Sequence, residues 1–144
     1  DPHATFFCMI SLETIGQYSD QRNSQDYPPL VGLFYPDRGD FIAFVGNLRS
    51  RNLVRRAVGT FRLGASVPSQ GAALPSLIPG VSLSDHRSFW EAGVPAFMVT
   101  DTAFYRDSHY HLATDTAERL RYESMTRVVS GLSRVVLDLC LVKP

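Results

Sequence analysis

FIAFVGNLRSRNLVRRAVGTFR, residues 41–62, joins two structural patterns in one segment. Residues 41–46 are apolar without alternation, which is typical of a strand that is buried on both faces. Asn47 follows and is a favourable residue for capping a helix. Residues 50–62 predict that helix, since five apolar residues recur at helical spacing with arginines on the other face: Leu53, Val54, Ala57, Val58 and Phe61.

Similar patterns lie on both sides of this segment. Residues 5–13 (TFFCMISLE) and 95–99 (PAFMV) predict two further buried strands of a parallel sheet. Residues 84–92 predict a short helix capped by Ser84. A long helix is predicted over 122–141 by one apolar stripe, interrupted by Gly131: Tyr122, Met125, Val128, Val129, Leu132, Val135, Val136 and Leu139. Alternating strands and helices predict an α/β layered sheet.

The remaining segments predict loops. Residues 17–40 are polar and rich in turn-forming residues, with Leu30–Phe34 as a candidate short strand. Residues 63–83 are rich in Gly, Pro and Ser, and residues 101–116 form a polar, aromatic loop. No repeat and no linker divides the 144 residues, so a single domain without an internal boundary is expected.

Composition excludes several classes of function. Lys and Arg number 14 and Asp and Glu number 14, so the net charge is zero, which argues against a general electrostatic attraction to nucleic acid or to an anionic membrane. No apolar run approaches the ~20 residues of a membrane span. Cys8 and Cys140 lie in apolar segments, which predicts two buried thiols; a disulfide between them is the alternative.

Candidate chemistry lies where the predicted strands end, because ligands of open α/β sheets gather at the carboxyl ends of strands. Glu13 closes the first strand and Asp101 follows the third. In the next loop, His109 and His111 would point the same way on an extended chain, and imidazole and carboxylate are ligands of zinc. On the pattern alone, a solvated polar loop is the favoured interpretation of this segment. Serine-hydrolase, nucleotide-binding and zincin motifs are absent from the sequence.

Four segments occur in a recognisable order before the long helix: MISLETIGQYSD, FIAFVGN, SDHRSFWEAGVPAFMVTDTAFYR and HYHLATDT. Together they resemble the C-terminal half of the zinc aminopeptidase family M28, as found in bacterial zinc peptidases. The resemblance extends from Met9 to the last helix. It implies that residues 1–144 are the C-terminal portion of a single α/β/α sandwich of the zinc-exopeptidase type. It also implies a site for two zinc ions at the carboxyl ends of the central strands.

The resemblance assigns three residues to the reaction centre. Glu13, in Leu12-Glu13-Thr14-Ile15-Gly16, matches a carboxylate ligand of one zinc. His111, in a Tyr-His-x-x-x-Asp-Thr motif, matches a histidine ligand of the other. Tyr110 matches a phenol that helps to stabilise the tetrahedral intermediate in some members.

Five further residues are expected around that centre. Asp85 and His86 match the family's Ser-Asp-His segment, and we expect them near the metals rather than bound to them. Asp115 is a candidate outer-shell carboxylate, since metal-bound imidazoles usually donate their other N–H to a partner. Tyr105 and Arg106 are candidates for a wall that faces the substrate.

The family's other metal ligands and its general base lie upstream of the strand that ends at Glu13. Residues 1–12 do not contain their motifs, and Asp1 and His3 do not replace them. We therefore expect weak zinc binding or none by this chain alone, and no activity. Half of such a sheet leaves one strand edge unpaired, so we expect a fragment that is covered by an upstream half of the same domain or by self-association.

The leading hypothesis is a hydrolase that removes N-terminal residues from peptides through a zinc-activated water. One alternative is a single-zinc acyltransferase of the glutaminyl cyclase type, which shares the fold. Another is a metal-free binding or structural relative. The upstream sequence would distinguish the three, and the cellular compartment stays open.

Overall fold

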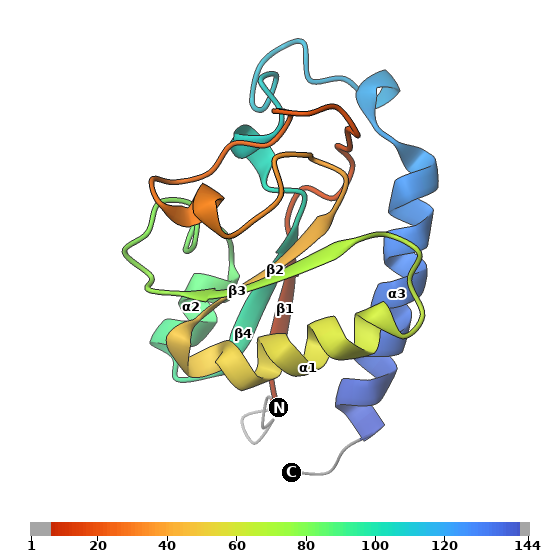
Figure 1. The fold of residues 1–144 in the computed structure, drawn as a ribbon. Helices are drawn as coiled ribbons and strands as arrows, with labels where there is room; N and C mark the ends of the chain where they lie inside the picture. The colour runs from red at the N-terminus through yellow and green to blue at the C-terminus, as the bar shows by residue number, and fades with distance from the viewer. Residues whose placement is uncertain (1–6, 142–144) are drawn as a thin grey trace.

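The computed structural model describes residues 7–141 and contains a four-stranded mixed sheet (Figure 1). The strands are β1 (Met9–Leu12), β2 (Ile42–Asn47), β3 (Ser69–Leu74) and β4 (Ala96–Thr100). Their order across the sheet is β1-β4-β2-β3. β1 is parallel to β4 and β3 is parallel to β2, but β2 and β4 are antiparallel. The α/β class is confirmed, whereas the expectation of a parallel sheet is wrong at the central strand pair.

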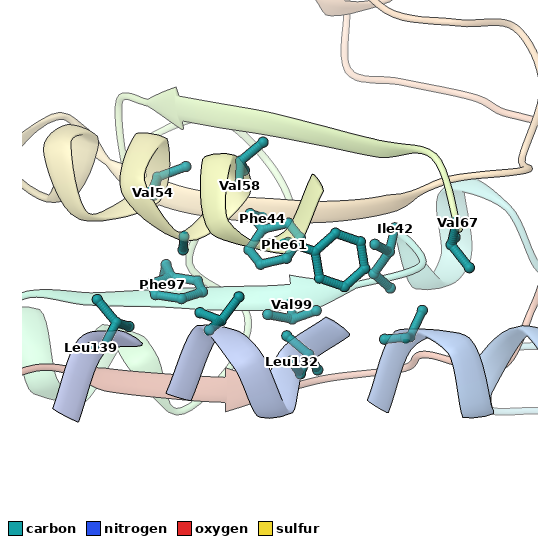
Figure 2. Packing of buried hydrophobic residues seen from close by; sticks show 13 residues of the cluster. Ile42, Phe44, Val54, Val58, Phe61, Val67, Phe97, Val99, Leu132 and Leu139 are labelled. Carbon is teal, nitrogen blue, oxygen red and sulfur yellow. The ribbon is translucent and has the colours of Figure 1, made fainter. Parts of the chain in front are cut away.

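Two helices cover one face of the sheet and enclose the core. They are α1 (Arg51–Arg62) and α3 (Tyr122–Leu141), which contact each other. Figure 2 shows their side chains meeting those of β2 and β4 in a cluster where Phe44 and Phe61 lie edge to face at 5.1 Å. The buried helix residues belong to the apolar stripes that the spacing predicts: Val54, Ala57, Val58, Phe61, Val128, Leu132, Val135 and Leu139.

The opposite face carries the short helix α2 (His86–Glu91) and loops. Ser11 alternates with Ile10 of the core and therefore points to this face. Its hydroxyl lies 2.6 Å from that of Ser84, just before α2. Ser84 is therefore not the predicted cap: Asp85 occupies the N-cap position, without a side-chain capping bond. Asn47 caps a short 3-10 helix, Leu48–Ser50, in which its side chain accepts from the Ser50 N–H at 2.9 Å, whereas the N-cap position of α1 itself is Ser50.

Two loop predictions were wrong. Residues 69–74 (SQGAAL) form β3 although their intrinsic strand propensity is low, because all six pair with β2. The candidate strand at 30–34 is instead a short 3-10 helix, Val31–Leu33, preceded by Leu30 in the left-handed region at a φ of 71°. Leu33, at 78% exposed, packs against little of the described chain, so no neighbouring strand stabilises an extended form.

The prediction of two buried thiols was half correct. Cys8 is partly buried, and burial raises its pKa, but Cys140 is exposed near the end of α3. Both cysteines are free, so the structure contains no disulfide between them. The predicted strand over 5–13 begins at Met9; its first two residues lie outside the described residues.

Some apolar surface lies uncovered by the described chain. β1 is an edge strand whose neighbour within residues 7–141 is β4, and Leu12 is 57% exposed. On α3, one side of the predicted stripe also faces outward, including Val129 and Val136. Within the same residues, no helix has the length and apolar character needed to cross a membrane.

Candidate active site

The loops after β1 and β4 begin side by side because these two strands are parallel. Hydrogen bonding continues past both strand ends: the Glu13 N–H donates to the Val99 carbonyl at 3.0 Å, and the Asp101 N–H donates to the Thr14 carbonyl at 2.7 Å. Glu13 is thereby placed at the sheet edge where ligands of α/β proteins bind. This edge is at the top of Figure 1, where both loops leave the sheet.

Asp101 connects these loops through its buried carboxylate. One oxygen accepts from the N–H groups of Gly16 at 2.9 Å and Gln17 at 2.8 Å, and the other accepts from the Ala103 N–H at 3.0 Å. These three charge-assisted hydrogen bonds satisfy a charge that would otherwise be expensive to bury. Asp101 therefore supports the site; the sequence placed it after a strand end as a candidate but assigned it no role.

Tyr110 lies between the two predicted zinc ligands. Its phenol lies near the Glu13 carboxylate at the edge of one cavity, and its ring stacks on His111 with centroids 3.9 Å apart. Burial, and then the negative charge of Glu13, raise the pKa of the Tyr110 phenol further above neutral pH, where a phenol is in any case protonated and can donate a hydrogen bond. The structure thus brings Glu13, Tyr110 and His111 together from segments almost a hundred positions apart.

The histidine loop is folded rather than extended. His111 has a φ of 61°, in the left-handed region that non-glycine residues rarely adopt. The Nδ1 of the His109 ring lies 2.7 Å from the Thr114 hydroxyl, and the backbone N–H of His109 donates to the buried Asp107 carboxylate at 3.0 Å. The prediction that both imidazoles point the same way is therefore wrong, because it required an extended chain. Asp115 is exposed near Tyr110 and lines with it a second cavity of about 210 Å³.

Asp85 and His86 differ in their surroundings. Asp85 is exposed at the start of α2, whereas His86 is fully buried. The His86 Nε2 lies 2.8 Å from the Val81 carbonyl, and its ring stands edge-on to Trp90 at 4.4 Å. Burial lowers the pKa of His86, although the charges of Glu13 and Asp85 act in the opposite direction. His86 is thus close enough to Glu13 to sense its charge, and its buried Nδ1 has no partner within the described chain.

Tyr105 and Arg106 also differ in what they contact. Tyr105 lines a cavity beside Glu13. Arg106 turns away from that cavity: its Nε donates to Gln25 at 2.8 Å, and its Nη1 donates to the carbonyls of Gln17 and Phe41, both at 2.9 Å. The Arg106 side chain therefore holds the 17–40 loop against the sheet, so of the two predicted wall residues Tyr105 alone lines this cavity.

The described residues do not form a complete metal centre. Across residues 7–141, no three His, Cys, Asp or Glu side chains gather in a way that could hold a metal ion. Zinc in proteins takes three or four such ligands. Glu13 and His111 fit the chemistry of zinc donors, but this pair does not by itself fit the two-zinc site that the resemblance implies.

A cavity that the sequence did not predict adjoins Glu13 and Tyr110. Its volume is about 110 Å³, several times that of a water site, and its floor is the sheet face opposite the core. The sequence did not predict the cavity because it predicted neither β3 nor the fold of the 17–40 loop. Both contribute residues to the lining.

The fold and these side chains define the class: an α/β protein with its polar site where two parallel strands end. Residues 51–136 match the model of peptidase family M28. An uncharacterized protein from Escherichia coli (strain K12), YfbL, is 46% identical over 125 residues, which are 86% of this chain and 39% of YfbL. No solved structure matches the chain significantly.

The chain belongs to peptidase family M28, as the resemblance indicated. The family match includes Tyr110 and His111 but begins after Glu13. As the name of this family states, its members are peptidases, which hydrolyse peptide bonds.

Proposed function

We propose that this chain is the C-terminal part of an aminopeptidase, which removes N-terminal residues from peptides with the help of zinc. The observation that carries the proposal is the gathering of a carboxylate, a phenol and an imidazole at one sheet edge: Glu13, Tyr110 and His111. When bound, zinc supplies a nucleophilic water at neutral pH by lowering the pKa of that water. Glu13 and His111 are the donors that this chain contributes.

Tyr110 has the chemistry of a donor to a developing oxyanion. A phenol is protonated at neutral pH, and the Tyr110 side chain lines the cavity at the site rather than the core. In the structure the phenol lies near the Glu13 carboxylate. With that carboxylate bound to a metal, the phenol would be free to face substrate, where a preorganised donor lowers the barrier to acyl transfer.

We further propose that an upstream part of the same domain completes the site and covers the exposed edge of β1. Two observations support this: Leu12 and the outer side of α3 are exposed apolar surface, and the chain spans 39% of the length of YfbL. An unpaired strand edge beside apolar surface favours pairing with a further strand. Self-association of the chain is the competing outcome.

Native mass spectrometry with added zinc tests both parts of this proposal. We expect the 144-residue chain to carry no stoichiometric zinc. The full gene product that contains this chain, with any upstream residues, should carry two zinc ions and hydrolyse leucine p-nitroanilide but not its N-acetylated form. Glu13→Gln should abolish hydrolysis, whereas Glu91→Gln on the exposed end of α2 should leave it unchanged.

Other results identify the alternatives. A single zinc, together with cyclisation of N-terminal glutamine, would replace the aminopeptidase with an acyltransferase. A full gene product that binds no zinc and hydrolyses neither substrate would leave a binding or structural protein. A zinc-free dimer of the chain alone would favour self-association over an upstream half.

A further inference from the structure

We infer that the outer face of α1 is a surface that binds an anionic lipid bilayer. The inference goes beyond the proposed function, because it uses none of the residues at the strand-end site. The zero net charge of the chain argues against a general attraction to anions, but the charges are distributed unevenly along the sequence. A local surface of one sign can still bind an anionic partner.

One long stretch of the sequence lacks acidic residues. No Asp or Glu occurs between Asp40 and Asp85, and the same stretch contains no Lys or His. It does contain five arginines, in or just before α1: Arg49, Arg51, Arg55, Arg56 and Arg62. More than a third of the 14 Lys and Arg residues therefore belong to one helix and the turn that leads into it.

Most of these arginines lie together on the surface. Arg51, Arg55 and Arg62 are exposed, and at about 100° per residue they lie within about 40° of one another around α1. Arg49 is exposed in the turn before the helix. Arg134 of α3 is exposed as well, and it donates to the carbonyl of the residue after α1 at 3.1 Å. We call these five residues the arginine face.

The charges of the arginine face are not neutralised by the described chain. Arg56, on another side of α1, pairs with Asp138 at 2.8 Å. Within residues 7–141, by contrast, no side chain of the arginine face forms an ion pair. Arg51 and Arg55 are four residues apart, a spacing at which like charges destabilise a helix. An anionic partner would offset this repulsion.

Exposed leucines lie at both ends of the arginine face. Leu48 begins the turn before α1 and is 57% exposed, and Leu63 follows α1 and is 78% exposed. A bilayer offers phosphates to the guanidinium groups and, just beneath them, acyl chains to the leucines. A nucleic-acid backbone would pair with the arginines but would give the leucines no apolar contact. The combination of residues therefore favours a lipid surface.

The arginine face is remote from the candidate active site. In Figure 1, α1 crosses the lower part of the sheet, whereas the loops of the site lie at the top. α1 packs on β2 and β3, and β1 is the opposite edge of the sheet from β3. An upstream part that covers β1 would therefore leave the arginine face open. The carboxylates that line the two cavities would face away from an anionic surface: Glu13, Asp101, Asp107 and Asp115.

Co-sedimentation of the 144-residue chain with vesicles at low salt tests the inference. We expect vesicles of phosphatidylcholine that contain phosphatidylglycerol to bind at least about tenfold more tightly than vesicles of phosphatidylcholine alone. Salt at about 0.5 M should remove this preference, because it screens the charges.

Charge-removing variants locate the surface. Arg51→Gln combined with Arg55→Gln should weaken binding roughly 25-fold, since each arginine near an anionic surface contributes about 1 kcal/mol. Arg38→Gln combined with Arg121→Gln changes the net charge equally at exposed positions outside the arginine face. This control should leave the affinity unchanged. Circular dichroism checks that each variant keeps the fold.

A pair of leucine variants distinguishes a bilayer from other polyanions. Leu63→Ala should weaken vesicle binding about threefold, because less apolar surface reaches the acyl chains. Leu77→Ala, at a position 93% exposed in the loop after β3, should leave binding unchanged.

Several results would overturn the inference. They are equal binding to the two kinds of vesicle, no binding to either, an arginine double variant with the affinity of the unaltered chain, or an unchanged affinity in Leu63→Ala. Binding of a DNA duplex or of polyglutamate without binding to vesicles would instead assign the arginine face to nucleic acid or to an acidic protein. Hydrolysis by the full gene product bears on the proposed function alone, so the two proposals can fail separately.

Discussion

At the scale of single residues, the site depends on which polar groups are free and which are already engaged. Asp101 and Arg106 form hydrogen bonds with backbone groups of neighbouring segments. Glu13 and Tyr110 lie near each other and line the cavity. Asp101 and Arg106 therefore hold the loops in place, whereas Glu13 and Tyr110 are available to bind a ligand.

Tyr110→Phe tests the proposed donor. In the full gene product we expect kcat to fall by roughly 100- to 1,000-fold, as when one oxyanion donor is removed, while KM and zinc content stay unchanged. Steady-state kinetics with leucine p-nitroanilide measure the effect. Tyr122→Phe, an exposed residue at the start of α3, is the matched control. An unchanged kcat in the Tyr110 variant would remove this residue from the mechanism.

His86 should make stability depend on pH. Its folded pKa lies below the ordinary value of about 6.5 because it is buried, so the unfolded chain binds the proton more readily. The free energy of unfolding is therefore unaffected by His86 above that value and falls as the pH drops below it. Urea unfolding between pH 7.5 and 5 should show this loss. His86→Gln should flatten the slope and His109→Gln should not; equal slopes in the two variants would contradict the expectation.

At the scale of elements, the close crossing of α1 and α3 explains a glycine inside a long helix. A Cβ at Gly131 would lie 2.4 Å from the Phe61 ring and 2.7 Å from the Ala65 Cβ. Glycine lowers the helix propensity of α3 by about 1 kcal/mol relative to alanine. Because it has no Cβ, it permits α3 to approach α1 this closely. The apolar stripe of α3 reaches the core through this contact.

Gly131→Ala should therefore destabilise the fold in spite of its better helix propensity. Overpacking of this kind typically lowers the free energy of unfolding by about 1–3 kcal/mol. Gly59→Ala in α1 is the control, since nothing lies within 4 Å of its added Cβ, and it should stabilise by about 0.5–1 kcal/mol. Thermal or urea unfolding compares the two, and a stabilised Gly131 variant would show that the helices have room to separate.

At the scale of the whole molecule, the sheet is covered unevenly. One face is closed by α1 and α3, and the other by α2 and loops that leave a cavity at the strand ends. The edge of β1 and the outer side of α3 remain available to an additional part of the protein. Site completion and surface coverage are therefore expected from the same upstream segment.

Val136→Asp tests that coverage. In the 144-residue chain the side chain is 47% exposed, so the change should cost about as much as Ser130→Asp, an exposed control on the same helix. In the full gene product a covered Val136 should make the aspartate more destabilising than the control by about 2 kcal/mol, because a charge would be buried. Thermal unfolding of both proteins measures the difference. Equal effects in both would mean that this face stays open.

The sequence alone determined the features that follow from local pattern. Apolar runs and helical spacing predicted β2, β4, α1 and α3, and four motifs in order predicted the peptidase family that the comparison confirmed. Glu13, Tyr110 and His111 were named from those motifs, and their roles stay predictions. Local patterns predict these elements because the burial of one helix face, or of both faces of a strand, determines the spacing of apolar residues along the sequence.

The tertiary structure decided what depends on partners far away in the chain. Residues 69–74 become a strand only because β2 supplies their hydrogen bonds, and Asp101 becomes a support only because the loop after β1 reaches it. The cavity exists because loops from three regions close over small side chains of the sheet. Pairing and enclosure of this kind are properties of the assembled fold, so no local pattern in the sequence could contain them.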